Sequence, residues 1–263
     1  MRIFIPLGMT ALAMSSIAVA DPYGPPHAVT DMAPFCATCH ASTSLTQLPD
    51  LRADTAAAES VEEKHLKQIK VAPAYKDLTP SERNTLLEAV RWVDAQATIT
   101  IQAPRQVKRN SRIEVKVVTR GGAGPVVGVS LVDSVLRFQA RPIGSSGFKV
   151  IGPPLVIGPD EKVQTAWIER RTRTADLGLA TIMISGIAGN AETRHVDETR
   201  ITWTLRCPPE PGIYRLAAVF YYGTEKAHPL GTVLRNGRPE PRGGSDSGSG
   251  RVMFSDAITL TVN

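Results

Sequence analysis

The sequence predicts an α+β protein of more than one domain, in which a small all-helical region precedes an antiparallel β-sandwich. Apolar residues recur at helical spacing between Thr55 and Val93, whereas after about Ala97 they alternate with a period of two. Turns rich in Gly and Pro separate the later apolar segments. We therefore expect residues 21–96 to form the first domain and residues 97–263 to form the second.

The first 20 residues have the layout of a secretory signal peptide. Arg2 supplies the positive charge, an apolar run follows, and the small residues Ala18 and Ala20 precede Asp21. We expect cleavage before Asp21 and export to the periplasm or beyond. No later segment is apolar over the length that crosses a bilayer, so we expect no transmembrane segment in the mature chain.

Two helices are expected in the first domain. Val61, His65 and Ile69 recur at helical spacing and form an apolar stripe. The second helix has Thr79 as its N-cap and Glu82 three residues later, which together form a capping box. Its buried side is expected to carry Leu86, Leu87, Val90 and Val93.

The second domain is expected to be an immunoglobulin-like β-sandwich, because seven or more short strands with turns between them are typical of that fold. A Pro-Gly turn before Tyr214 indicates a tyrosine corner, and Trp167, Trp203 and Tyr214 are expected in the core. The polar segment 237–250 is expected to be a flexible loop. The predicted strands have the sequences TITIQA, RIEVKVV, VGVSLVD, LRFQA, FKVIG, ATIMISGI, RITWTLR, IYRLAAVFYY and AITLTVN.

The stretch APFCATCHAS carries the candidate site, formed by Cys36, Cys39 and His40. Covalent attachment of haem needs two thiols that reach its two vinyl groups and a histidine that lies under the iron. A redox dithiol does not need His40, and a zinc site usually needs a second cysteine pair. The motif therefore predicts one covalently bound haem c.

This motif and the later segment VAPAYKDLTPSERNTLLEAVRWV together resemble the class I monohaem c-type cytochromes, over about Ala33 to Asp94. The resemblance implies a small all-α, cytochrome c-like haem domain. It also implies that Cys36 and Cys39 form the thioether bonds and that His40 is the proximal iron ligand. The sequence departs from the family at the methionine ligand, where it reads KVAPAYKDL.

The sixth iron position therefore needs another ligand or is vacant. His65 is the first candidate, because it lies on the apolar stripe of the helix that leads to the expected ligand loop. His27 and Met32 are alternatives, and a vacant position would hold water or a small ligand. Ligation by two histidines lowers the reduction potential relative to His–Met ligation, whereas a vacancy permits ligand binding.

Cys207 has no partner cysteine once the haem motif is assigned, so we expect a free thiol. Together with His195, His228 and Met253 it supplies the residue types of a blue-copper site. These residues are too far apart in the sequence for the short ligand loop of such sites, so we expect no copper.

Charge divides unevenly along the chain. Residues 21–94 contain 7 Lys and Arg against 11 Asp and Glu, a net charge of −4, whereas residues 95–263 contain 22 against 14, a net charge of +8. Such asymmetry steers charged partners over long range. No nucleic-acid motif accompanies the basic part, so we expect no nucleic-acid partner.

No triad, carboxylate pair or phosphate loop is recognisable in the sequence, so we expect an electron carrier rather than an enzyme. The expected partner is a redox protein, which the β-sandwich would dock, or a multi-subunit complex that it would help to assemble. Two alternatives stay open. One is a haem-based gas or redox sensor with an open iron site, and the other is a haem-bearing structural subunit of a larger oxidoreductase.

Overall fold

The computed structural model describes residues 61–133, 143–165, 179–242 and 250–263. Several residues with predicted roles lie outside these ranges, namely the signal peptide 1–20, His27, Met32, Cys36, Cys39, His40 and Trp167. Within the described ranges, no helix has both the length and the apolar character needed to span a membrane.

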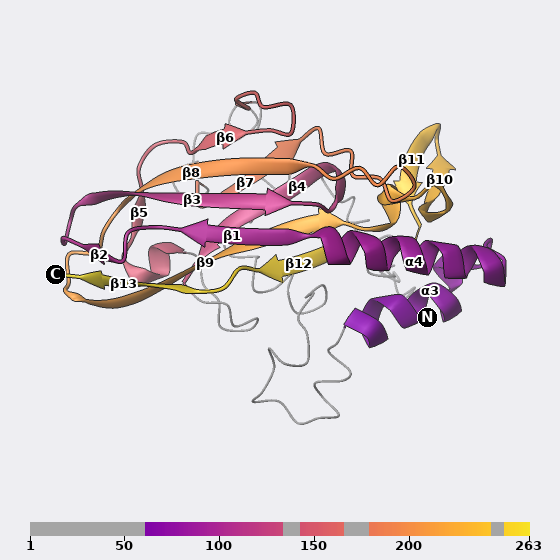
Figure 1. Ribbon diagram of the computed structural model, residues 1–263, viewed down its shortest axis with the longest axis horizontal. Helices are drawn as coiled ribbons and strands as arrows, with labels where there is room; N and C mark the ends of the chain where they lie inside the picture. The colour runs from indigo at the N-terminus through magenta and orange to yellow at the C-terminus, as the bar shows by residue number, and fades with distance from the viewer. Residues whose placement is uncertain (1–60, 134–142, 166–178, 243–249) are drawn as a thin grey trace, which may run out of the picture.

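The chain enters these ranges in a short helical region and continues into strands (Figure 1). The helical elements are η2 (Glu62–Leu66), α3 (Lys67–Val71), η3 (Pro73–Tyr75), α4 (Pro80–Gln96), η4 (Ile143–Ser146), η6 (Glu225–Ala227) and η7 (Pro229–Gly231). The strands are β1 (Thr98–Gln102), β2 (Gln106–Val107), β3 (Arg112–Arg120), β4 (Ala123–Val132), β5 (Lys149–Val150), β6 (Leu155–Ile157), β7 (Thr181–Ser185), β8 (Glu198–Arg206), β9 (Gly212–Gly223), β10 (Thr232–Arg235), β11 (Arg238–Pro241), β12 (Gly250–Phe254) and β13 (Ile258–Val262).

Two sheets form a β-sandwich. One has the order β1-β3-β8-β5, with β6 also paired to β8, and the other has the order β2-β13-β9-β4-β7, with β12 also paired to β9. All of these pairs are antiparallel except β13 with β2. The largest apolar cluster among the described residues joins the inner faces of the two sheets. The antiparallel sandwich expected from the period-two pattern is therefore present.

Buried and exposed residues alternate along the strands, and the buried ones form the core. In β3 and β8 every second residue is buried, and the register sets Val115 opposite Trp203 in the core. The indole N–H of Trp203 donates to the carbonyl oxygen of Leu179 at 2.8 Å, so its polar atom is satisfied inside the sandwich. The prediction that Trp203 is a core aromatic is confirmed.

Tyr214 forms the predicted tyrosine corner. Its hydroxyl donates to the carbonyl oxygen of Glu210 at 2.9 Å, four residues earlier in the chain. Its ring also packs edge-on against Phe148, with the ring centroids 5.6 Å apart. The turn before β9 is therefore tied to the strand that follows it.

The predicted capping box is present at the start of α4. The backbone N–H of Glu82 donates to the Thr79 hydroxyl at 3.3 Å, and the backbone N–H of Thr79 donates to the Glu82 carboxylate at 2.8 Å. Pro80 occupies the first helical position, where its missing N–H costs nothing. Local sequence therefore determines where α4 begins.

The expected all-α, cytochrome c-like haem domain is wrong for this part of the chain, and so is the fold class built on it. Strands predominate among the described residues, and α4 contributes Ala89 and Val93, and its C-cap Ala97, to the sandwich core. The helix ends at Gln96 and β1 begins at Thr98. The apolar side of α4 that the resemblance would turn toward a haem is therefore divided: Val93 packs on the sandwich core, and the other three predicted residues pack against the preceding helix. The helix lies at one end of the sandwich (Figure 1).

A second, smaller cluster holds the helices together. Its buried members are Leu66, Ile69, Tyr75, Leu78, Leu86, Leu87 and Val90, with Val61, Ala72 and Leu230 packed against it. The two predicted apolar stripes thus face one another. Because Leu230 belongs to the η7 turn, this cluster also contacts the β-domain.

Three features of the strands differ from the expectation. β6 and β12 are strands that are absent from the predicted set. The expected loop 237–250 begins with β11, which pairs with β10 across an Asn236–Gly237 turn. Both turn residues have positive φ, the conformation that a tight hairpin needs. Residues 243–249 of that loop lie outside the described ranges.

Candidate functional site

The haem motif itself falls outside the described residues, whereas the predicted sixth ligand is inside them. His65 lies in η2, a π-helical segment in which the N–H of Lys67 donates to the carbonyl oxygen of Glu62. Such segments are rare and are often found at functional sites. The structure therefore places His65 in a π-helical segment near residue 61, where the described residues begin.

His65 is buried, with 3% of its surface exposed. Leu66, which follows it in η2, and Ile69 of α3 both pack into the small helical cluster. The predicted apolar stripe of Val61, His65 and Ile69 is therefore confirmed as a buried side of the helix. Ligation of iron by His65 remains a prediction, because His40 lies outside the described ranges.

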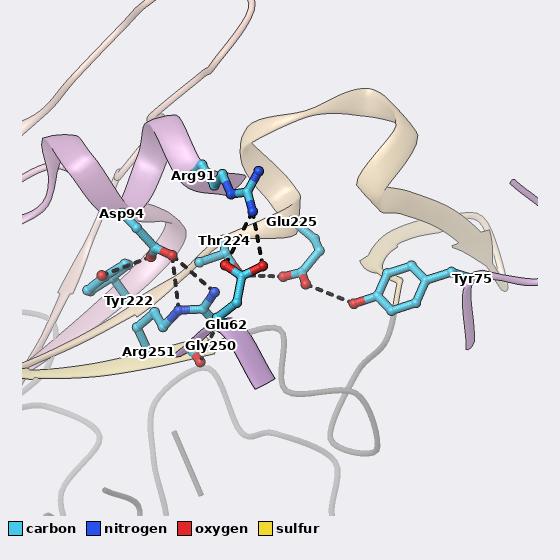
Figure 2. A network of polar contacts seen from close by, with 9 residues as sticks. All are labelled: Glu62, Tyr75, Arg91, Asp94, Tyr222, Thr224, Glu225, Gly250 and Arg251. Carbon is cyan, nitrogen blue, oxygen red and sulfur yellow. Dashed lines mark hydrogen bonds and ion pairs between the residues drawn. The ribbon is translucent and has the colours of Figure 1, made fainter. Parts of the chain in front are cut away.

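A network of buried polar groups lies where the helices meet the sandwich (Figure 2). Arg251 of β12 is at its centre, and its guanidinium donates to the Asp94 carboxylate of α4 at 3.1 and 3.2 Å. The Tyr222 hydroxyl of β9 donates to the other Asp94 oxygen at 3.1 Å. Asp94 therefore joins α4 to two neighbouring strands.

The second part of the network surrounds Glu225 in η6. The Tyr75 hydroxyl of η3 donates to one carboxylate oxygen at 2.9 Å, and the Thr224 hydroxyl bonds the other. Glu225 is 2% exposed and Tyr75 is fully buried. This carboxylate therefore links the loop between the two helices to the turn that follows β9.

Burial dominates the electrostatics of both carboxyl groups. It raises the pKa of Glu225, and the hydrogen bond from Thr224, the charge of Arg251 and the hydrogen bond from Tyr75 oppose the rise. It also raises the pKa of Asp94, against the charge and hydrogen bonds of Arg251. Burial and the neighbouring Glu225 carboxylate raise the pKa of the Tyr75 phenol, which is therefore neutral at physiological pH.

The network is built to hold elements together rather than to meet a substrate. The side chain of Arg251 has no exposed surface, and Glu225 is almost as inaccessible. Buried charges persist only when they are paired and hydrogen-bonded, which the Asp94 contact provides for Arg251. The network therefore fixes the helical segment from η2 to α4 (residues 62–96) on the sandwich. We call this segment the helical cap.

Sequence reasoning missed this network. Arg251 stands at an inward position of β12, opposite Tyr222, where the strand pattern would predict an apolar residue. A charged residue at a strand position that should be buried is therefore the feature of the sequence that could have indicated this network. Its partner Asp94 lies 157 residues away in the sequence, so periodicity could not identify the pair.

The residues of the blue-copper type, His195, His228 and Cys207, make contacts with different parts of the protein. His195 Nε2 lies 2.9 Å from Asp197, whose second oxygen accepts the N–H of Ala188, and His228 Nδ1 accepts the N–H of Leu230. Cys207 is a free, buried cysteine, as predicted. Among the residues that the structure describes, no group of three or more His, Cys, Asp or Glu side chains could hold a metal ion.

Comparison with known proteins adds little to this site. No protein-family profile matches the chain, and no curated protein matches it. Among solved structures, the chain is similar to the CARDB domain of the PF1109 protein from Pyrococcus furiosus, solved in complex with di-metal ions. The two share 14% identity over 64% of this chain and 90% of that one, with a TM-score of 0.25. At these values nothing about that protein's metal is carried over to this chain.

Proposed function

We propose that this chain is an exported protein that carries one covalent haem c and exchanges electrons with a redox partner protein. The single observation that carries the proposal is the Cys36-x-x-Cys39-His40 motif, whose residues supply both thiols and the adjacent imidazole. The leader supports it, because c-type haem is attached after export. The proposal does not need a cytochrome c fold in residues 61–96.

The residues of the chain divide the work of holding the haem. Cys36 and Cys39 would form the thioether bonds, His40 would be the proximal ligand, and His65 would occupy the sixth position. A bound haem supplies a one-electron iron couple, whose potential the axial ligands and burial set. The burial of His65 fits this role, since histidine is a common axial ligand of haem iron and a buried imidazole is shielded from water.

The β-sandwich would bind the partner or assemble the protein into a larger complex. Its helical cap is held by the Arg251–Asp94 pair, so the helix that carries His65 is joined to a rigid scaffold through α4. Glu62, at the start of that π-helical segment, pairs with Arg91 of α4 at 3.0 Å. The exposed pair contributes little by itself, and the buried cluster of Leu66 and Ile69 with the apolar residues of α4 holds the His65 segment in place.

A second candidate function is ligand sensing at an open iron site. It is favoured by the absence of methionine between Met32 and Met183, because the usual sixth ligand is missing. Carbon monoxide separates the two functions. An unchanged ferrous spectrum indicates an electron carrier with six-coordinate iron, whereas a shifted spectrum indicates an open site.

The test of haem attachment compares the three cysteines of the chain. The full sequence is exported in a host that attaches c-type haem, and haem is then measured after acid–acetone extraction and by intact mass. We expect the wild type and the Cys207→Ala control to retain one haem, and the Cys36→Ala/Cys39→Ala variant to lose it. Extraction of haem from the wild type would refute covalent attachment.

A further inference from the structure

Three cations lie side by side at one end of the outer face of the β1-β3-β8-β5 sheet. Arg112 of β3 is directly opposite Arg206 of β8, and Lys149 of β5 is opposite Arg206 on the other side. All three are exposed. Side chains directly opposite in neighbouring strands lie close enough to interact, so like charges there destabilise the sheet. We call these three residues the basic row.

The other paired cations of this face show the contrast. Lys116 lies 4.0 Å from Glu114, and Arg200 contacts both Glu161 and Glu198. Within the described part of the chain, no ion pair is recorded for any member of the basic row. The paired cations therefore have carboxylate partners, whereas among the described residues Glu114, the acidic side chain next to Arg112 on this face, pairs with Lys116 instead.

The turn before β3 extends the positive charge. It exposes Lys108 and Arg109, and it is held against the end of β8 because the N–H of Asn110 donates to the carbonyl oxygen of Pro208 at 3.3 Å. Glu210 is the acidic side chain of the neighbouring turn before β9. This end of the sandwich, where β2 and β5 also lie, is opposite the helical cap (Figure 1).

We propose that the basic row is a docking surface for an acidic face of a partner protein. The outward positions next to the row are Glu114 and Thr204, which are polar and unsuited to insertion into lipid. Charge complementarity therefore favours a folded acidic surface over a membrane. Docking of this kind acts mainly by steering the encounter, and it weakens as salt screens the charges. The inference does not depend on the presence of haem.

The experiment measures binding of the full chain to immobilised poly-L-glutamate, with vesicles of phosphatidylserine and phosphatidylcholine as a second probe. Arg112→Glu/Arg206→Glu changes the basic row, and Lys116→Glu/Arg200→Glu changes the paired cations of the same face by the same net charge. We expect the first variant to lower affinity for poly-L-glutamate about tenfold at low salt and the second to change it much less.

Equal losses in the two variants would overturn the proposal, because net charge alone would then explain binding. Loss of vesicle binding with unchanged binding to poly-L-glutamate would also overturn it, in favour of a lipid surface. Arg206→Gln provides a check that does not reverse charge. Because it removes repulsion between neighbours, we expect it to leave the unfolding midpoint unchanged or higher while it weakens binding to poly-L-glutamate.

Discussion

At the scale of single residues, Glu225 is the clearest departure from an ordinary surface carboxylate. It is buried, accepts hydrogen bonds from Tyr75 and Thr224, and has a raised pKa. A raised folded-state pKa means that the folded protein binds the proton more readily than the unfolded chain does. The stability linked to Glu225 is therefore fully present below the unfolded carboxyl pKa and is lost as pH rises through the folded value.

This linkage predicts the effect of Glu225→Gln. The amide does not titrate, and its oxygen can still accept the Tyr75 hydrogen bond. We expect the free energy of unfolding of the wild type to fall relative to Glu225→Gln as pH rises from about 4 to 8. Urea unfolding at several pH values measures the difference. The exposed Glu88→Gln serves as the control, and a parallel pH profile for the wild type and Glu225→Gln would contradict the expectation.

His65 provides a second prediction at this scale. If it is the sixth iron ligand, His65→Ala should convert a six-coordinate, low-spin haem spectrum into a high-spin one. A purely structural histidine would lower stability and leave the spin state unchanged. Absorption spectra and urea unfolding of the same variant separate these outcomes, because His65 is also buried against the helical cluster.

At the scale of elements, the sequence predicts those features that depend on interactions between residues close together in the chain. The capping box of Thr79 and Glu82, the alternation of β3 and β8, and the Tyr214 corner could all be predicted from short stretches of sequence. Each of these features depends on residues that are close in the chain or on one repeated period. Long-range partners such as Arg251 and Asp94 could not be predicted in this way.

The helices show where a resemblance misled. The same apolar spacing that suits a helix facing haem also suits a helix facing a sheet, so periodicity could not identify what α4 packs against. In the structure Ala89 and Val93 lie in the sandwich core, whereas Leu86, Leu87 and Val90 pack against the preceding helix. In the candidate site, both the haem motif and the buried stripe that carries His65 could be predicted from the sequence, whereas the π-helical geometry around His65 could not.

The joint between α4 and β12 carries a prediction of its own. Arg251→Met would leave the Asp94 carboxylate buried without its cation, and we expect a loss of about 3 to 5 kcal/mol in the free energy of unfolding. Arg91→Met, which removes the exposed pair with Glu62, should cost less than about 1 kcal/mol. Urea unfolding compares the two variants.

A double variant distinguishes the loss of the ion pair from the loss of side-chain packing. In Asp94→Asn/Arg251→Met neither charge remains, so we expect the combined loss to be smaller than the sum of the two single losses. Additive losses would show that the pair contributes nothing beyond the shape of its side chains. In that case the helical cap would be held by apolar contacts and by the Tyr75–Glu225 hydrogen bond, without a contribution from the ion pair.

At the scale of the whole molecule, the β-sandwich is a scaffold with two different ends. One end is closed by the helical cap and holds His65, and the other carries the basic row. The net charge of +8 over residues 95–263 would attract acidic partners to this part of the chain. The proposed electron carrier therefore combines a haem-bearing N-terminal region with a basic domain for docking.

The most direct measurement is the absorption spectrum of the full exported chain, oxidised and reduced, with haem quantified per polypeptide and carbon monoxide then added. The account predicts one covalent haem per chain and a reversible low-spin spectrum that carbon monoxide does not change. A chain that matures without haem would contradict the account altogether. A spectrum shifted by carbon monoxide would contradict the closed electron carrier and establish an open iron site instead.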